Sequence, residues 1–193
     1  MATIKILAFN GSPRQGGNTA TLLAALGEGV EAAGGLFEPI RICDLDIQPC
    51  ISCGACDTTG ACILEDDMQE LYEKIVTADR IVLASPIYFY GITAQAKALV
   101  DRTQALWNRQ RLPAEEGRWL LDPRRRGLLL AVAATKGPKV FDGAILTAKY
   151  AFEAMGFAYG GEVVFRGLEE CGDADRNQEA LARAREAGRL LAQ

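Results

Sequence analysis

The strongest constraint on the fold is the alternation of short apolar, β-branched runs with longer segments whose apolar residues recur with a helical period. This alternation is typical of βαβ units, in which parallel strands are joined by helices that cover the faces of one sheet. The expected strands are residues 3–9, 38–43, 80–85, 127–135 and 160–167. The run at 127–135 is apolar nearly throughout, as expected of a strand covered on both faces.

Five amphipathic stripes lie between and after these strands, and each is suited to burying one helix face. Glycines at 34 and 156 stand where helices end, while Asp66 and Asp175 are predicted N-caps. Five strands and five helices favour an α/β fold of the flavodoxin type over a six-stranded dinucleotide fold. We expect a doubly wound, five-stranded parallel sheet in the order 2-1-3-4-5, with helices on both faces. The stripes are Leu22, Leu23, Leu26 and Val30; Met68, Leu71, Ile75 and Val76; Ala96, Leu99, Val100, Leu106 and Trp107; Ile145, Ala148, Phe152 and Met155; and Leu181, Ala184, Ala187 and Leu191.

The length of 193 residues and the apolar content of 49 % predict a single domain over residues 1–193. Two segments exceed the minimal plan of such a domain. One is a cysteine-rich insertion at about 44–65, and the other is a polar loop at 108–126 that carries Trp119 and Leu120. Insertions of this length are usually functional or form interfaces.

Charge and residue usage exclude several classes of function. A net charge of −4 argues against nucleic acid or an anionic membrane surface as a partner. The run Arg124 to Arg126 is interpreted as a solvated loop that enters a strand, with a site for a nucleotide 2′-phosphate as the alternative. No apolar stretch is long enough for a membrane span and no signal peptide is evident, so a cytoplasmic protein is expected. The absence of histidine excludes Ser-His and Cys-His nucleophilic catalysis.

The segment "NGSPRQGGNTAT", residues 10–21, has the form of a phosphate-binding loop between a strand and a helix. Gly11 and Gly16 have the spacing of a Walker A loop, but Gly17 replaces its lysine and Asn18 replaces its serine or threonine. The loop also lacks the G-x-G-x-x-G pattern of a dinucleotide site. These departures exclude a nucleoside triphosphate and disfavour a dinucleotide.

A terminal monophosphate remains as the ligand that this loop suits. Ser12, Asn18 and Thr19 supply hydroxyl and amide groups, and Arg14 supplies positive charge. Free backbone N–H groups and the helix dipole favour an anion at this position. An ordinary strand-to-helix turn with a capping residue is the alternative.

A cluster of aromatic residues follows the third expected strand, in "SPIYFYGITAQAKALVDR". Tyr88, Phe89 and Tyr90 are consecutive there, although aromatic residues are only 7 % of the chain. Ligands of open α/β sheets bind beyond the carboxyl ends of the strands, between the first and third strands in flavodoxin order. An aromatic loop beside a phosphate loop favours a flat ring system carrying a monophosphate. Aromatic packing at a subunit interface is compatible with this interpretation and is also its alternative.

Four cysteines have the spacing C-x2-C-x2-C-x5-C, namely Cys50, Cys53, Cys56 and Cys62. In a reducing compartment, cysteines are ligands or free thiols more often than disulfides. The compact spacing suits the four ligands of a [4Fe–4S] cluster. Unmetallated thiols and structural zinc are the two alternatives. Cys43 and Cys171 lie outside the pattern and are interpreted as buried or incidental thiols.

Together, these three segments resemble the NADPH-dependent FMN reductase-like flavoproteins, specifically their iron-sulfur flavoprotein branch. The resemblance implies that the first loop holds the FMN phosphate and that loops after the third and fourth strands meet the flavin ring. The implied phosphate site is Ser12, Arg14, Asn18 and Thr19, with Pro13 and Gly17 shaping the loop. The implied ring contacts are Pro86, Ile87, Tyr88, Phe89, Tyr90 and Gly91, together with Ala134, Thr135, Lys136 and Gly137.

We therefore expect an FMN-dependent oxidoreductase that passes electrons between NAD(P)H or a ferredoxin-like donor, FMN and a [4Fe–4S] cluster. The flavin carries the chemistry, so no catalytic side chain is predicted. The resemblance implies a homodimer or homotetramer, with a small molecule or a ferredoxin-like protein as the other electron partner. The alternatives are a cluster-free NAD(P)H:FMN or quinone reductase and a noncatalytic flavin-binding electron carrier.

Overall fold

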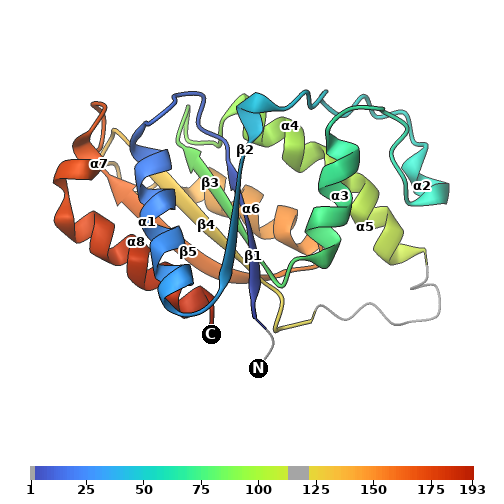
Figure 1. Ribbon diagram of the computed structural model, residues 1–193. Coiled ribbons are helices and arrows are strands. Elements are labelled where there is room, and N and C mark those ends of the chain that lie inside the picture. Colours follow the sequence, from blue (N-terminus) through green and yellow to red (C-terminus); the bar gives the residue numbers. More distant parts are fainter. Residues whose placement is uncertain (1–2, 113–121) are drawn as a thin grey trace.

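The computed structural model describes residues 3–112 and 122–193, and its centre is a five-stranded sheet (Figure 1). All of its neighbouring strands pair in parallel, in the order β2-β1-β3-β4-β5. The predicted fold class is confirmed, and the expected strands differ from the observed ones by at most two residues at either end. The strands are β1 (Lys5–Asn10), β2 (Leu36–Arg41), β3 (Arg80–Pro86), β4 (Arg126–Ala133) and β5 (Ala158–Arg166).

Helices cover both faces of the sheet, as the doubly wound plan requires (Figure 1). One face is covered by α1 (Asn18–Ala32), α7 (Asp173–Arg176) and α8 (Gln178–Leu191). The other is covered by α3 (Met68–Thr77), α4 (Ala94–Arg102), α5 (Gln104–Arg111) and α6 (Asp142–Ala154). Two short elements, η1 (Ile42–Asp44) and α2 (Cys56–Thr59), lie in the segment after β2. No helix in the described ranges is long and apolar enough to cross a membrane.

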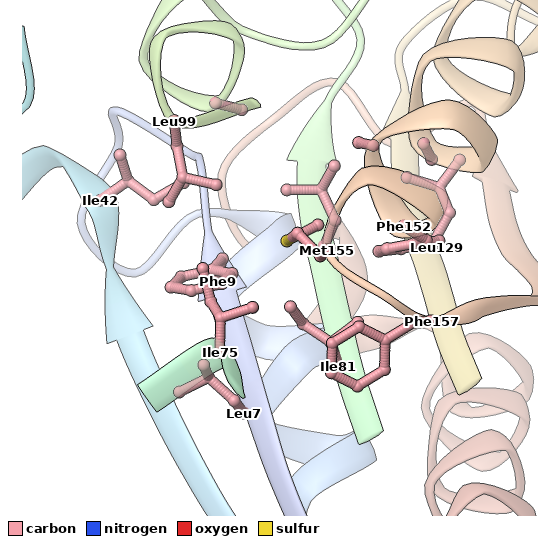
Figure 2. Close-up of a cluster of buried hydrophobic side chains, with 14 of the residues drawn as sticks. Leu7, Phe9, Ile42, Ile75, Ile81, Leu99, Leu129, Phe152, Met155 and Phe157 are labelled. Atoms are coloured by element: carbon pink, nitrogen blue, oxygen red, sulfur yellow. The ribbon is translucent and has the colours of Figure 1, made fainter. Parts of the chain in front are cut away.

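The alternation of side chains along each strand divides the core into two layers. In β1, Ile6 and Ala8 pack against α1 and α8, whereas Leu7 and Phe9 pack toward α3 and α4. Figure 2 shows the second layer, where Phe9 and Ile81 from the strands lie near Ile75 of α3 and Phe157. Burial of both faces explains why the central strands read as continuous apolar runs.

The structure corrects the third expected helix and one expected cap. The stripe from Ala96 to Trp107 is divided into α4 and α5 at Thr103, whose hydroxyl donates a hydrogen bond to the Val100 carbonyl at 2.7 Å. Such side-chain bonds compete with the regular helical ladder. Asp175 is not the cap of the last helix, because Asn177 accepts from the Ala180 N–H at 3.0 Å in that role. The predicted interface residues at 119 and 120 lie outside the described residues.

The run Arg124 to Arg126 lies at the amino end of β4, not at the carboxyl edge of the sheet. Arg125 is only partly exposed: its guanidinium lies 4.1 Å from the ring centroid of Phe157 and donates to the Ile75, Val76 and Ala78 carbonyls. It therefore satisfies the free carbonyls at the end of α3. These positions remove the basis for a 2′-phosphate site beside the strands' carboxyl ends.

Candidate functional site

The first part of the site is the loop between β1 and α1, which leads directly into a 15-residue helix. Gly17 is the N-cap and supplies no side-chain cap, and the first turn contains no acidic residue. The first N–H groups of a helix have no partner within the helix, and their dipoles favour an anion. The amino-terminal end of α1 therefore has the positive electrostatic character that a phosphate group requires.

Side chains before and beyond the loop hold it in shape. Asn10 Oδ1 accepts from the Ser12 N–H at 3.0 Å, and Ser12 Oγ accepts from the Arg14 N–H at 3.3 Å. From the other side, the Thr93 hydroxyl donates to the Gly11 carbonyl at 2.7 Å and accepts from an α4 N–H. The sequence prediction missed Asn10 and Thr93, although Thr93 stands where an N-cap precedes a helical stripe.

Asn18 makes two contacts beyond the phosphate-site role that the resemblance implies. Its Nδ2 donates to the Glu170 carbonyl at 2.9 Å, and its Oδ1 accepts from the Ala174 N–H at 3.0 Å. The side chain thus ties the start of α1 to the segment after β5. The backbone N–H of Asn18, at the first position of α1, is a further donor available to an anion site.

The second part of the site is a tight turn after β3. Tyr88 and Gly91 exchange two backbone hydrogen bonds of 3.0 Å, which leaves Phe89 and Tyr90 as the two central residues. Phe89 has φ 49° and Tyr90 has φ 64°, in the left-handed region that costs a non-glycine residue about 1–2 kcal/mol. Phe89 is fully exposed, at 105 % of its reference area. Backbone strain combined with exposed aromatic rings is typical of a functional turn.

A cleft of about 250 Å³ lies where these two segments meet, at the carboxyl ends of β1, β3 and β4. Most of the predicted phosphate and ring residues line it: Ser12, Arg14, Gly17, Asn18, Thr19, Pro86, Ile87, Tyr88 and Ala134. Pro13, Phe89, Tyr90, Gly91, Thr135, Lys136 and Gly137 are not among its lining residues. The prediction also missed Leu168 and Glu169, which follow β5 at the same sheet edge and line the cleft.

Both cysteines outside the four-cysteine pattern lie beside the phosphate loop. Cys43 Sγ donates to the Ser12 carbonyl at 3.5 Å, and Cys171 Sγ donates to the Gly16 carbonyl at 3.7 Å. Cys43 is half-buried and Cys171 is exposed. The loop is thus flanked by one thiol from the segment after β2 and one from the segment after β5.

The four patterned cysteines lie elsewhere, in the long segment between η1 and α3. All four line one pocket of about 480 Å³, together with Asp101 and Gln104 at the α4–α5 junction. Left-handed backbone at Ser52, Gly54 and Gly60 turns the chain around this pocket. A Cβ at Gly60 would lie 2.8 Å from the Arg109 Cα, so only glycine permits this approach to α5.

The four cysteines share a pocket without forming a ready site for a single metal ion in the described part of the chain. Within the described ranges, no three Cys, Asp or Glu side chains are grouped so that they could hold one metal ion. A [4Fe–4S] cube takes one thiolate at each of four corners, so its ligands surround a cavity and do not converge on a point. The four cysteines of the pattern line one such cavity.

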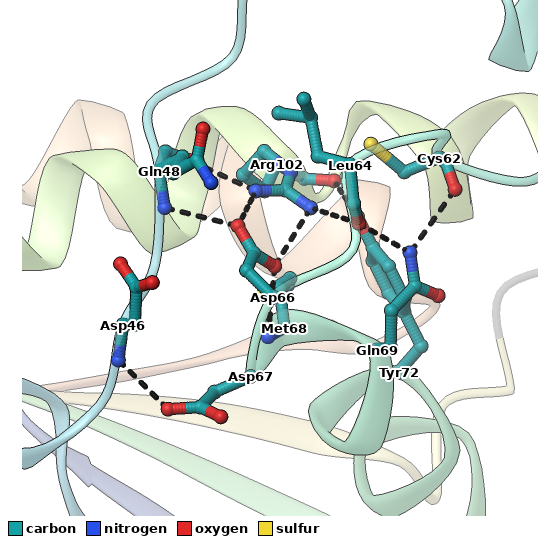
Figure 3. A network of polar contacts seen from close by, with 10 residues as sticks. All are labelled: Asp46, Gln48, Cys62, Leu64, Asp66, Asp67, Met68, Gln69, Tyr72 and Arg102. Atoms are coloured by element: carbon teal, nitrogen blue, oxygen red, sulfur yellow. Dashed lines mark hydrogen bonds and ion pairs between the residues drawn. The ribbon is translucent and has the colours of Figure 1, made fainter.

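A buried ion pair closes the base of the cysteine segment (Figure 3). Arg102, at the end of α4, donates to Asp66 Oδ2 at 2.5 Å and to Oδ1 at 3.1 Å, and both side chains are 0 % exposed. The same guanidinium donates to the Gln48 carbonyl at 2.9 Å and to the Leu64 carbonyl at 3.4 Å. It therefore joins the two ends of the segment that carries all four cysteines.

Asp66 is ionised in this setting. Burial opposes its ionisation, but hydrogen bonds from Arg102 and from the backbone N–H groups of Gln48 and Met68 outweigh burial and lower its pKa. The N-cap of α3 is Asp67 and not Asp66 as expected, but Asp66 still satisfies a free N–H at the start of the helix through its bond to Met68. Nothing in the sequence pattern indicated that this carboxylate also pairs with Arg102.

The two pockets share no lining residue. In Figure 1 the phosphate loop lies at the start of α1, whereas the cysteine segment with α2 lies beyond α3, beside α5. One chain therefore carries two separate candidate cofactor sites.

Comparison with known proteins places this geometry in a family. The model of the NADPH-dependent FMN reductase family matches residues 4–135. An iron-sulfur flavoprotein from Methanocaldococcus jannaschii is 39 % identical over 103 residues, which are 53 % of each chain. The match therefore spans about half the length of that relative. A Bacillus subtilis protein, provisionally named an NAD(P)H-dependent FMN-containing oxidoreductase, is 26 % identical over 182 residues, or 94 % of each chain.

Solved structures agree on the fold. The NAD(P)H:quinone oxidoreductase from Methanothermobacter marburgensis superposes with a TM-score of 0.73, at 18 % identity, covering 100 % of this chain and 98 % of that one. The family match includes the phosphate loop, the cysteine segment and the aromatic turn, and it covers more than half of the 193 residues. The chain belongs to the NADPH-dependent FMN reductase family.

Proposed function

We propose that the protein is an FMN-dependent oxidoreductase that binds FMN in the cleft between the phosphate loop and the aromatic turn. The observation that carries this proposal is the meeting of an uncapped helix start with an exposed aromatic turn, at the switch point between β1 and β3. The matched family supports FMN as the ligand. When bound, FMN supplies one- and two-electron redox chemistry.

The chain's own residues would bind and orient the cofactor. The start of α1 and Arg14 would neutralise the phosphate, while Ile87 and Tyr88 would border the ring. Ala134, from the loop after β4, would border the same cleft. Because hydride transfer depends on orientation more than on a protein acid or base, the absence of histidine is no obstacle.

A finer proposal assigns a [4Fe–4S] cluster to Cys50, Cys53, Cys56 and Cys62. It is supported by their shared pocket and by the similarity to iron-sulfur flavoproteins over about half of the chain. Such a cluster exchanges single electrons, whereas FMN accepts pairs from NAD(P)H or single electrons from a ferredoxin-like donor. Iron and sulfide assays on anaerobically purified protein separate this proposal from a cluster-free FMN or quinone reductase.

The electron path is proposed to run between subunits of a homodimer or homotetramer. Separate pockets within one chain support this arrangement, because a neighbouring subunit would bring a second flavin toward the cysteine pocket. The exposed aromatic turn offers an apolar surface for such contact. Sedimentation tests the proposal: a monomer whose own flavin fully reduces its cluster would contradict it.

FMN binding is tested by comparing FMN with riboflavin, which lacks the phosphate. Arg14→Gln is expected to weaken FMN binding roughly five-fold, as for an exposed charge contact, and to leave riboflavin binding unchanged. Arg124→Gln is the matched control, because it removes an exposed charge at the opposite sheet edge. Equal weakening of both ligands by Arg14→Gln would contradict the phosphate site.

Turnover distinguishes an enzyme from a carrier. The FMN-loaded protein is expected to oxidise NADPH or NADH in the presence of small-molecule acceptors. No turnover with either nucleotide and any acceptor would favour the noncatalytic electron carrier.

A further inference from the structure

Asn108 is a buried polar residue on the side of α5 that faces the cysteine segment. Its side-chain Nδ2 lies 3.3 Å from the Cys56 Sγ and 2.8 Å from Asp57 Oδ1. Its Oδ1 accepts from Gln104 Nε2 at 3.2 Å, and only 7 % of the residue is exposed. Every polar atom of this amide is therefore engaged, and one of its hydrogens is directed at a cysteine of the four-cysteine pattern.

The neighbours of Asn108 determine which end of its amide meets the sulfur. The Asp57 carboxylate is solely an acceptor when ionised, and Cys56 sulfur is an acceptor when it is a thiolate. Turning the amide around would place its oxygen against both acceptors and would lose both hydrogen bonds. The N–H group is thus the end that Cys56 meets.

A hydrogen bond to a ligand sulfur changes the electronic balance of a metal cluster. One electron from reduced FMN adds one negative charge to the cluster and its thiolates, and no bond forms or breaks. An N–H donor stabilises the more negative, reduced form more than the oxidised form, and hydrogen bonds to sulfur are a recognised determinant of cluster potentials. Burial strengthens the effect because water does not screen the amide.

We propose that Asn108 raises the reduction potential of the cluster through its hydrogen bond to Cys56, and so favours electron transfer from FMN. This inference rests on the proposed function, because it presupposes the cluster at the four cysteines. Asn108 is a positioning residue in this account and not a ligand. Its predicted effect is on potential, and it is not required for cluster assembly.

Asn108→Leu tests the proposal because leucine is close to asparagine in size but has no N–H group. The midpoint potential is measured in the anaerobically purified full chain by redox titration, with visible and electron paramagnetic resonance spectra. Iron and sulfide contents equal to wild type, combined with a lower midpoint potential, are the expected result. Gln110→Leu is the matched control, because it removes an amide on the opposite side of α5 that donates to the Ala154 carbonyl. The midpoint potential of the cluster in Gln110→Leu is expected to equal that of wild type.

Asn108→Ala provides a second variant if leucine disturbs the loop. It removes the N–H donor without adding bulk or a titratable group, so it also lowers the potential. A loaded variant with an unchanged potential would overturn the inference and leave the proposed function intact. Loss of iron from both variants would overturn it too, since Asn108 would then be needed to hold the loop. A wild-type protein without iron would overturn both the cluster assignment and the inference.

Discussion

Replacing Arg102 by methionine is predicted to cost a large share of the protein's stability. Methionine keeps much of the side-chain length but none of the donors, so Asp66 would stay buried without its partner. Removing one member of a buried ion pair costs about 3–5 kcal/mol. Arg102 Nε is buried and has no partner in the described part of the chain, so the pair is incompletely satisfied and a value near 3 kcal/mol is expected.

The free energy of unfolding is measured by urea unfolding of the full chain at neutral pH, monitored by far-UV circular dichroism. In thermal unfolding of a domain of this size, a loss of about 3 kcal/mol corresponds to a fall in Tm of roughly 6–12 °C. Lys97→Met is the control, because Lys97 forms an exposed pair with Asp101 four residues away and such pairs contribute less than about 0.5 kcal/mol. If Arg102→Met cost less than about 1 kcal/mol, the ion pair between Arg102 and Asp66 would not be what holds the two ends of the cysteine segment together.

Three further predictions concern pH, helix packing and the aromatic turn. Because the pKa of Asp66 is lower in the folded than in the unfolded chain, its contribution is full above the unfolded value and is lost as pH falls through the folded value. The unfolding free energy of wild type should therefore fall more steeply than that of Asp66→Asn below about pH 4, and parallel curves would contradict the ionised pair. Gly188→Ala should destabilise by about 1–3 kcal/mol, because its Cβ would lie 1.9 Å from the Leu26 carbonyl oxygen and force α1 and α8 apart. A calorimetric Tm at or above that of wild type would show that helix propensity outweighs this clash. Phe89→Gly should leave stability unchanged or raise it by up to about 1 kcal/mol, because it relieves left-handed strain at a fully exposed residue. A clear loss of stability would mean that the ring packs in the folded state.

The sheet was predictable because each central strand is buried on both faces and therefore appears as an uninterrupted apolar run. Helix periodicity was similarly clear, but the boundary at Thr103 was not. The residues on both sides of Thr103 share one stripe, and the break depends on a local hydroxyl bond that periodicity does not reveal. The cap at Asn177 was missed because Asp175 offers the same chemistry two residues earlier.

The phosphate loop and aromatic turn were predictable because each is a continuous segment of unusual composition. The contribution of Glu169 was not, since it depends on how the segment after β5 folds over the edge of the sheet. The role of Asn18 was also hidden, because its partners lie more than 150 residues away in sequence. Likewise, Asp66 and Arg102 are 36 residues apart and meet only once α4 packs beside the cysteine segment.

The decisive measurement for both proposed cofactors is the anaerobic visible spectrum of the purified protein, with flavin, iron and sulfide quantified per chain. We expect about one FMN per chain, bleached by NAD(P)H or a low-potential donor, with about four iron and four sulfide. FMN without iron would retain the flavin site and remove the cluster. A protein that binds no FMN, even after reconstitution, would contradict the proposed flavin site and the function built on it.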